Sequence, residues 1–263
     1  MDLDLAGKRA FISGSTQGIG FAVAEALSAE GVDVVLNGRS QERVDAAVER
    51  LRATSPASDP AGIAADVAVA EEVDDLVEQL GPVDILVNNV GIFGLDDFGS
   101  ITDADWQRYF DINVMSGVRL SRALLPGMLQ RGWGRIVFVS SESGVTIPAD
   151  MIHYGTSKAS MIALGNGLAK LTRGTAVTVN TVLGGPTYSG GVAETVTAIA
   201  ESQSVPAEEI AQSLIAQNRT TLLERFLEPA EIANLIVFLS SPKSSATNGT
   251  AVRADGGVLT SML

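Results

Sequence analysis

The feature that most constrains this chain is a regular alternation of short β-branched runs with longer segments of helical spacing. Runs such as RAFIS and GRIVFVSS place apolar residues at consecutive positions, so both faces of each strand are apolar. Such strands are typical of a parallel sheet that is covered by helices on both sides. We therefore predict an α/β fold, a doubly wound parallel sheet of about seven strands flanked by helices, in a single domain over residues 1–263. The predicted strands are 9–13, 32–37, 62–66, 84–89, 134–141, 176–183 and 250–255.

The helical segments lie between these strands, with one irregular stretch near the C-terminal end. Residues 187–228 show helical patterns without a strand, and GGPTYSGG (184–191) precedes them with possible glycine hinges. We expect 187–228 to form a helical substrate lid. Its apolar residues Val192, Val196, Ile199 and Ala200 could face a cleft or pack as core contacts, and both alternatives stay open. The other predicted helices are 19–30, 41–53, 70–80, 103–131, 152–172 and 229–240.

Composition excludes several kinds of site. The chain has no Cys and one His, so a disulfide framework or a zinc site is not expected, and no metal is assigned. A formal net charge of −13 disfavours binding to nucleic acid or to anionic membranes. The opening MDLDLAGKR has acidic residues where a signal peptide would be basic, and no apolar run has membrane length. We therefore expect a soluble cytoplasmic protein.

A glycine cluster follows the first strand and runs into a helix. In SGSTQGIGFAVAEAL (13–27), Gly14, Gly18 and Gly20 allow a tight turn and the close approach of a pyrophosphate to a helix N-terminus. The spacing predicts a dinucleotide site, although glycines also make ordinary strand-to-helix turns.

Polar and glycine-bearing clusters also end three later strands. NNVG (88–91), SSESG (140–144) and GGPT (184–187) each follow a predicted strand. Ligands of doubly wound sheets bind beyond the carboxyl ends of the strands. Together with the first glycine cluster, these segments outline one site at that edge.

These motifs together resemble the short-chain dehydrogenase/reductase family in its classical form. The matching pieces are the glycines of 14–20, NNVG, Asn113 in DINV, Ser141, the Tyr154–Lys158 pair and GGPT, and they cover nearly the whole chain. The resemblance implies a Rossmann-type fold, an oxidoreductase activity and a homotetramer. Ser13 and Gly184 depart from the family pattern, which has Thr and Pro at these places; Ser13 keeps the hydroxyl, whereas Gly184 loosens the backbone beside the substrate.

The stretch HYGTSKAS (153–160) holds the expected proton donor. On a helix, Tyr154 and Lys158 lie at i and i+4 on one face, and the cation is expected to lower the pKa of the phenol. The resemblance assigns Tyr154 as the proton donor in reduction and Lys158 as the residue that lowers its pKa and holds the ribose. It assigns Ser141 to the substrate carbonyl, and Asn113 to the helix backbone and a water leading to Lys158. Tyr154 and Lys158 could also be a plain helix-surface pair, and His153, about 100° away, is expected to be a surface or packing residue.

The end of the second strand points to the cofactor. It reads VVLNGRS, with Gly38 where family members that use NAD commonly carry Asp, and Arg39 after it. A guanidinium in place of a carboxylate suits a 2′-phosphate, so NADP(H) is expected over NAD(H); a turn glycine beside a solvated arginine is the alternative. Asp66 resembles the adenine contact or is a helix N-cap, and NNVG could be only a tight turn. The resemblance implies cofactor contacts from Gly14, Ser15, Gln17, Gly18, Ile19, Gly20, Gly38, Arg39, Asp66, Val67, Asn88, Val90, Gly91, Tyr154, Lys158, Gly185, Pro186 and Thr187.

The leading functional hypothesis is an NADPH-dependent reductase of a ketone or aldehyde. A 3-oxoacyl-[acyl-carrier-protein] reductase and a non-catalytic NADP(H)-binding regulatory protein are the alternatives. Between Gly174 and Asn218 there is no Lys or Arg, while Glu194, Glu201, Glu208 and Glu209 are present. A neutral, largely apolar substrate is therefore expected, although Arg131, Arg135 and Arg173 could supply a local basic patch.

The expected homotetramer also has support in the helical segments. The segments 103–131 and 152–172 carry small and apolar residues on several faces, which calls for packing partners beyond the chain's own sheet. In the second segment these residues are Ala159, Met161, Ala163, Leu164, Gly165, Gly167 and Leu168.

Overall fold

The computed structural model describes residues 2–55, 59–217 and 221–262, and its centre is one parallel sheet. Seven strands lie in the order β3-β2-β1-β4-β5-β6-β7, and every adjacent pair is parallel. The chain thus winds outward from β1 in one direction and from β4 in the other, which confirms the doubly wound fold. The strands are β1 (Arg9–Ile12), β2 (Asp33–Gly38), β3 (Ala61–Ala64), β4 (Ile85–Asn88), β5 (Trp133–Ser141), β6 (Ala176–Gly184) and β7 (Ala251–Ala254).

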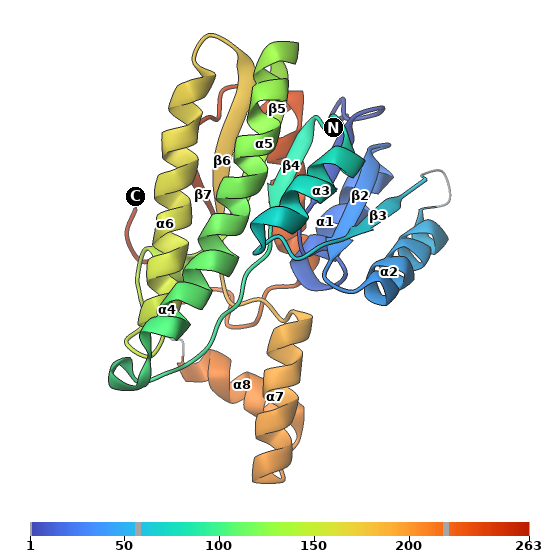
Figure 1. Ribbon diagram of the computed structural model, residues 1–263. Coiled ribbons are helices and arrows are strands. Elements are labelled where there is room, and N and C mark those ends of the chain that lie inside the picture. Colours follow the sequence, from blue (N-terminus) through green and yellow to red (C-terminus); the bar gives the residue numbers. More distant parts are fainter. Residues whose placement is uncertain (1, 56–58, 218–220, 263) are drawn as a thin grey trace.

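Helices cover both faces of this sheet (Figure 1). Apolar side chains of α1, α2 and α9 form one buried cluster with the sheet, and those of α3, α5 and α6 form another on the opposite face. Because β-branched residues fill the central strands on both sides, neither face can be left to solvent. The helices are α1 (Gly18–Ala29), α2 (Gln41–Thr54), α3 (Ala70–Leu80), α4 (Asp103–Tyr109), α5 (Ser116–Arg131), α6 (Ile152–Ala169), α7 (Gly190–Gln203), α8 (Ala207–Gln217) and α9 (Pro229–Ser240).

The segment expected as one helix over 103–131 is three pieces in the structure. A π-helix, Phe110–Met115, separates α4 from α5. Wider turns of this kind carry one extra residue and are frequent at functional sites. Asn113 lies within this turn and is buried. Helix 152–172 is likewise shorter than expected, because α6 ends at Ala169 and a 3₁₀ turn follows over Lys170–Thr172.

Helices α7 and α8 project beyond the carboxyl edge of the sheet (Figure 1). They pack on each other through a small apolar cluster of Val196, Ala200 and Ile210, and Val192 and Ile199 lie against it. The packing alternative therefore holds for these apolar residues, and they do not present a free face to the cleft. Part of the expected lid, residues 218–220, lies outside the described residues.

No helix within the described part of the chain has the length and apolar character needed to span a bilayer.

Candidate active site

A cleft of about 760 Å³ runs along the carboxyl ends of the strands. It begins at the turn after β1, passes the ends of β2, β3 and β4, and reaches the start of α7. This is where the topology of a doubly wound sheet predicts a ligand. Its lining is Gly14, Thr16, Gln17, Gly18, Ile19, Asn37, Gly38, Arg39, Ser40, Arg43, Ala65, Asp66, Val67, Asn89, Val90, Gly91, Ile92, Phe93, Ile112, Ser189, Gly190 and Gly191.

The glycine loop forms one wall of the cleft. Gly14 and Gly18 have φ angles of +62° and +60°, a left-handed conformation that other residues rarely adopt. A Cβ at Gly14 would also lie 2.8 Å from Cγ2 of Val90. Helix α1 begins at Gly18 without a side-chain cap, so its first amides are available to an anion. This cradle of bare backbone fits the pyrophosphate of a dinucleotide.

The end of the cleft beside β2 is basic. Arg39 and Arg43 are exposed, line the cleft, and have no hydrogen bond or ion pair to any described residue. Gly38 beside them offers no carboxylate to bind a 2′-hydroxyl. Two unengaged guanidinium groups at this place fit a 2′-phosphate.

Asp66 is not the N-cap of α3, which is Val69, and its contact with adenine stays a prediction. It lines the cleft, and its Oδ1 accepts a hydrogen bond of 3.0 Å from the backbone N–H of Ala68 in the turn before α3.

The predicted catalytic residues lie together behind the cleft lining, next to Gly91 and Phe93, and none of them lines the cleft itself. The ring of Tyr154 lies edge-on to the ring of Phe93, with centroids 6.4 Å apart. Nζ of Lys158 lies 5.7 Å from the centroid of the Tyr154 ring and donates a 3.0 Å hydrogen bond to the carbonyl of Val139. Lys158 is buried, and a Cβ at Gly91 would lie 3.1 Å from its Nζ, so glycine there lets the ammonium lie directly behind the cleft lining.

Asn113 ties the loop after β4 to this corner. Its Oδ1 accepts a 2.7 Å hydrogen bond from the N–H of Ile92, and its Nδ2 donates to the Ile92 carbonyl and to Oγ of Ser157. The side chain therefore fixes the backbone of a cleft residue against α6, at the residue directly before Lys158.

The pKa values in this corner differ from those expected of an i, i+4 pair. Burial raises the pKa of Tyr154, the nearby Ser141 side chain opposes the shift, and the charge of Glu142 adds to it. Burial lowers the pKa of Lys158 to about 8. The expected lowering of the Tyr154 pKa is therefore wrong for the protein alone, because desolvation outweighs an ammonium that is turned toward the Val139 carbonyl.

Ser141 ends β5 and has a close carboxylate neighbour. Its hydroxyl donates a short hydrogen bond to Oε2 of Glu142 and accepts one of 3.1 Å from the N–H of Ser143. The sequence analysis did not identify Glu142 as a site residue. Its position directly after the expected substrate-binding serine could have indicated that it lies in the site.

His153 is a packing residue. It is 1% exposed, its ring lies 4.0 Å from that of Tyr109, and its Nε2 lies 3.5 Å from Oδ2 of Asp96. The surface alternative for His153 is therefore wrong, and no contact places the imidazole on Tyr154.

Some residues expected at the cofactor are turned elsewhere. The Ser15 hydroxyl donates 2.7 Å to the carbonyl of Ile12, and Nδ2 of Asn88 donates 3.3 Å to Oγ of Ser121. Their neighbours Thr16 and Asn89 line the cleft instead. Gly20 is buried, and a Cβ there would lie 2.5 Å from Nδ2 of Asn89, so this glycine permits close packing of α1.

The segment GGPT lies beside the C-terminal strand. A Cβ at Gly185 would lie 2.5 Å from the carbonyl oxygen of Asp255, and the Thr187 hydroxyl donates 2.9 Å to the Gly185 carbonyl. Neither these residues nor Pro186 line the cleft as the described structure has it. An expected hinge is thus a tight backbone contact.

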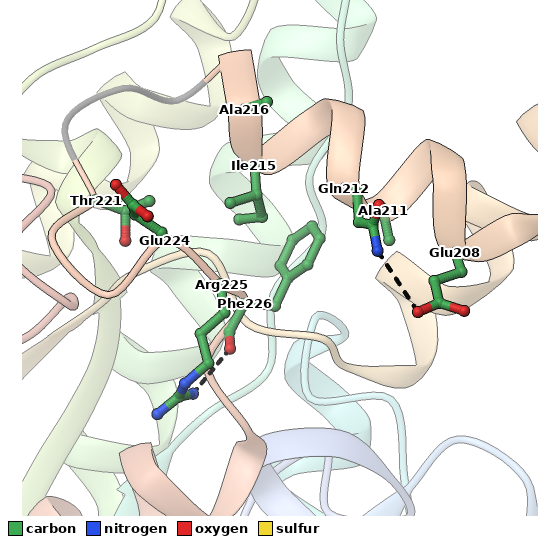
Figure 2. A pocket seen from close by; sticks show the side chains of 9 residues that line it. All are labelled: Glu208, Ala211, Gln212, Ile215, Ala216, Thr221, Glu224, Arg225 and Phe226. Atoms are coloured by element: carbon green, nitrogen blue, oxygen red, sulfur yellow. Dashed lines mark hydrogen bonds between the residues drawn. The ribbon is translucent and has the colours of Figure 1, made fainter.

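A second cavity, of about 670 Å³, lies between α8 and residues 221–226 (Figure 2). Ile215 and Phe226 supply its apolar part, and Gln212 donates to the carboxylate of Glu208 at 3.5 Å. The Arg225 guanidinium makes two hydrogen bonds to Glu231, at 2.7 and 2.8 Å, so its charge is already paired. The glycine loop and Phe93, whose ring lies against Tyr154, line the sheet-edge cleft and not this cavity, which makes the sheet-edge cleft the candidate active site.

Among the described residues, no group of three or more His, Asp or Glu side chains could hold a metal ion.

Comparisons with known proteins indicate the same family that the sequence motifs resemble. Residues 8–200 match the family model described as short chain dehydrogenase. The chain is 42% identical to the uncharacterized oxidoreductase YvrD of Bacillus subtilis, over 100% of both chains. It is 32% identical to a 3-oxoacyl-[acyl-carrier-protein] reductase of Aquifex aeolicus, covering 98% of this chain and 100% of the relative. Its fold is similar to that of L-sorbose reductase from Gluconobacter frateurii, solved with NADPH and L-sorbose, with a TM-score of 0.94, 32% identity and 100% of both chains covered.

Proposed function

This chain belongs to the short-chain dehydrogenase family, and we propose that it is an NADPH-dependent oxidoreductase that reversibly reduces a ketone or aldehyde to an alcohol. The observation that carries this proposal is the corner where Ser141, Tyr154 and Lys158 meet the glycine-lined cleft. A regulatory protein that only binds NADP(H) needs no proton donor beside the cleft, so this corner argues against that alternative.

Each side chain in the corner has a role in reduction. Bound NADPH supplies the hydride. Tyr154, whose phenol is protonated at neutral pH, donates the proton to the carbonyl oxygen. Ser141 orients the carbonyl by a hydrogen bond, and Lys158 holds the ribose hydroxyls. Asn113 acts indirectly, by fixing the Ile92 backbone.

The preference for NADPH rests on the basic end of the cleft. Arg39 and Arg43 present two guanidinium groups without partners among the described residues. A 2′-phosphate can accept hydrogen bonds from both, whereas a 2′-hydroxyl gains little from them. The NADPH bound to the similar L-sorbose reductase agrees with this preference.

The substrate is a neutral carbonyl compound with a largely apolar body. Exposed apolar side chains surround the corner: Phe93 faces Tyr154, and Val145 and Ile147 follow the 3₁₀ turn after β5. The segment from Gly174 to Asn218 supplies no cation. L-sorbose, bound to the similar reductase, is itself a neutral ketone.

A 3-oxoacyl-[acyl-carrier-protein] reductase is the second candidate, because the Aquifex aeolicus relative has that activity. Such an enzyme must attract an acidic partner, and the expected basic patch of Arg131, Arg135 and Arg173 does not serve the cleft. Arg131 and Arg173 precede β5 and β6, and Arg135 lies near the start of β5, so all three lie at the amino-terminal edge of the sheet. Arg135 is buried there, and Arg131 donates to the carbonyl of Val83.

The oxidation of NADPH over a panel of carbonyl compounds tests the proposal. We expect turnover of a neutral aryl or alkyl ketone and little of an acetoacetyl thioester. Strong preference for the thioester would favour the carrier-protein reductase, and NADPH binding without any turnover would favour the regulatory protein.

We also propose a homotetramer in the cytoplasm, built from single-domain chains with 187–228 as the lid. Helix α6 leaves small residues exposed on its outer face, Ala163 and Gly167, and nothing lies within 4 Å of a Cβ placed at Gly167. Small exposed residues let two helices approach closely across a two-fold axis. Light scattering at micromolar concentration tests this, and a monomeric mass would contradict it.

A further inference from the structure

A single carboxylate stands at the point where the substrate carbonyl is expected. Glu142 directly follows Ser141 and is half-buried. Its Oε2 accepts hydrogen bonds from the Ser141 hydroxyl and, at 2.7 Å, from the N–H of Ser143. Any group that reaches the Ser141 hydroxyl therefore also comes within reach of Glu142.

No cation among the described residues neutralises this carboxylate. Glu142 takes part in no ion pair there, and the nearby Lys158 ammonium donates to the Val139 carbonyl. The charge is felt at the reacting group, because Glu142 contributes to the raised pKa of Tyr154. The field in this corner opposes a substrate that carries a carboxylate or phosphate near its carbonyl.

Exposed apolar side chains lie near Tyr154 and on the segment that follows Glu142. Phe93, Val145 and Ile147 are 43%, 49% and 41% exposed, and a Cβ at Gly155, next to Tyr154, would touch Ile147 at 2.5 Å. A polar group of the substrate thus has Glu142, Ser141 and Tyr154 to bind at this end of the cleft.

The Ser141 hydroxyl has one proton, and in this structure Glu142 receives it. To donate to a substrate carbonyl, Ser141 must turn away from Glu142, and the carboxylate then loses a charge-assisted hydrogen bond. A substrate with its own hydroxyl can replace Ser141 on Glu142 and release Ser141 for the carbonyl. The two oxygens of an α-hydroxy ketone lie about one hydrogen-bond length apart, so both contacts can form together.

We propose that Glu142 is a specificity-determining residue that selects carbonyl compounds with a hydroxyl on the carbon next to the carbonyl and rejects those with a carboxylate there. This inference rests on the proposed reductase function and narrows its substrate class to α-hydroxy ketones with an apolar remainder. The simpler role for Glu142 is to cap the turn Glu142–Gly144 through the Ser143 N–H. Glutamine can keep that cap while removing the charge, so Glu142→Gln separates the two roles.

Four matched aryl ketones test the inference: 2-hydroxyacetophenone, 2-methoxyacetophenone, acetophenone and phenylglyoxylate. The methoxy compound keeps the adjacent oxygen and lacks the donor. We expect wild-type kcat/KM to be about tenfold or more higher for the hydroxy than for the methoxy ketone, and lowest for phenylglyoxylate. In Glu142→Gln the hydroxy-to-methoxy ratio should fall several-fold and the relative use of phenylglyoxylate should rise. Asp150→Asn, an exposed carboxylate on the loop before α6, should leave both ratios at the wild-type value.

Each outcome bears on one proposal in particular. Equal kcat/KM for the hydroxy and methoxy ketones, or ratios that Glu142→Gln leaves unchanged, would overturn the role of Glu142 while the reductase function stands. Failure to oxidise NADPH with these four and with the wider carbonyl panel would overturn the proposed function, and the inference with it. Thermal unfolding and NADPH binding of Glu142→Gln verify that the variant is folded.

Discussion

The arginines at the two edges of the sheet differ in burial and in hydrogen bonding. At the amino-terminal edge, Arg135 is buried and donates to three carbonyls, those of Ser241 (3.1 Å), Gly134 (2.9 Å) and Ala176 (2.7 Å). At the carboxyl edge, Arg39 and Arg43 are exposed and engage no described residue.

This difference gives the arginines different roles: Arg135 contributes to folding stability, whereas Arg39 and Arg43 remain available to a ligand. A guanidinium surrounded by backbone carbonyls joins β5, β6 and the turn after α9, and it has no capacity left for a ligand. A guanidinium without a partner adds little to folding and keeps its full hydrogen-bonding capacity for a phosphate. The chain thus engages Arg135 at one edge and leaves Arg39 and Arg43 open at the other, where the cleft lies.

The largest effect is expected at the carboxyl edge, from Tyr154→Phe. Loss of the phenolic proton donor should reduce kcat by about a thousandfold, within the range typical of a general acid, and should leave NADPH binding near the wild-type value. Steady-state kinetics and NADPH fluorescence titration measure the two. Substantial residual reduction by Tyr154→Phe would contradict the role of Tyr154 as proton donor. An equal loss of kcat per folded molecule in His153→Ala would indicate that the histidine takes part in proton transfer.

The next effect is expected at the amino-terminal edge. Arg135→Met should lower the free energy of unfolding by about 2–4 kcal/mol, because three carbonyls lose their donor. Turnover of the folded enzyme should stay near wild type. Urea unfolding measures the loss, and Arg52→Met, which removes an exposed ion pair with Glu49, is the matched control with an expected change below about 1 kcal/mol.

A smaller effect is expected from Arg39→Ala. The Km for NADPH should rise about tenfold and that for NADH should change little, because only the 2′-phosphate loses a charge-assisted contact. Adding Arg43→Ala should raise the NADPH value further. Comparable use of NADH and NADPH by the wild type would contradict the assignment of this end of the cleft.

A reversal of cofactor preference is expected from two changes at this end of the cleft and is helped by a third. Gly38→Asp with Arg39→Leu supplies the carboxylate and removes the cation, and should favour NADH. A Cβ at Gly38 would, however, lie 2.6 Å from Cγ2 of Thr16, so Thr16→Ser should improve the double variant. Catalytic efficiencies with both cofactors measure the shift.

The smallest effect is a pH dependence. Burial lowers the pKa of Lys158 to about 8, so its ammonium is present below that pH and lost above it. If the ammonium holds the ribose, NADPH binding should weaken as pH rises through about 8, by up to about tenfold per unit until the pKa of the complex is reached. Fluorescence titration of the protein measures this, and Lys158→Met should show no such step.

Sequence alone was sufficient for the alternation of elements and for the edge at which the motifs meet, because both follow from chain order. It was insufficient for the direction of side chains at the strand ends, where the alternation of the two faces stops. Asn88 and Ser15 were therefore expected at the cofactor, whereas their neighbours Asn89 and Thr16 line the cleft. It gave no measure of burial, which reverses the expected shift in the Tyr154 pKa. The suggested basic patch of Arg131, Arg135 and Arg173 could have been placed away from the cleft from sequence alone. Arginines just before a strand or at its start must lie at the amino-terminal edge of a parallel sheet.

The π-helix Phe110–Met115 imposes a constraint on chain length. The wide turn takes up one more residue than an α turn would, which sets Asn113 toward Ile92 and Ser157 while α4 and α5 continue on either side. Deleting one residue there would allow an uninterrupted helix but would rotate α4 by about 100° relative to α5. The number of residues between Thr102, which caps α4, and Ser116, which begins α5, is therefore fixed by function, and natural insertions and deletions should fall outside this interval.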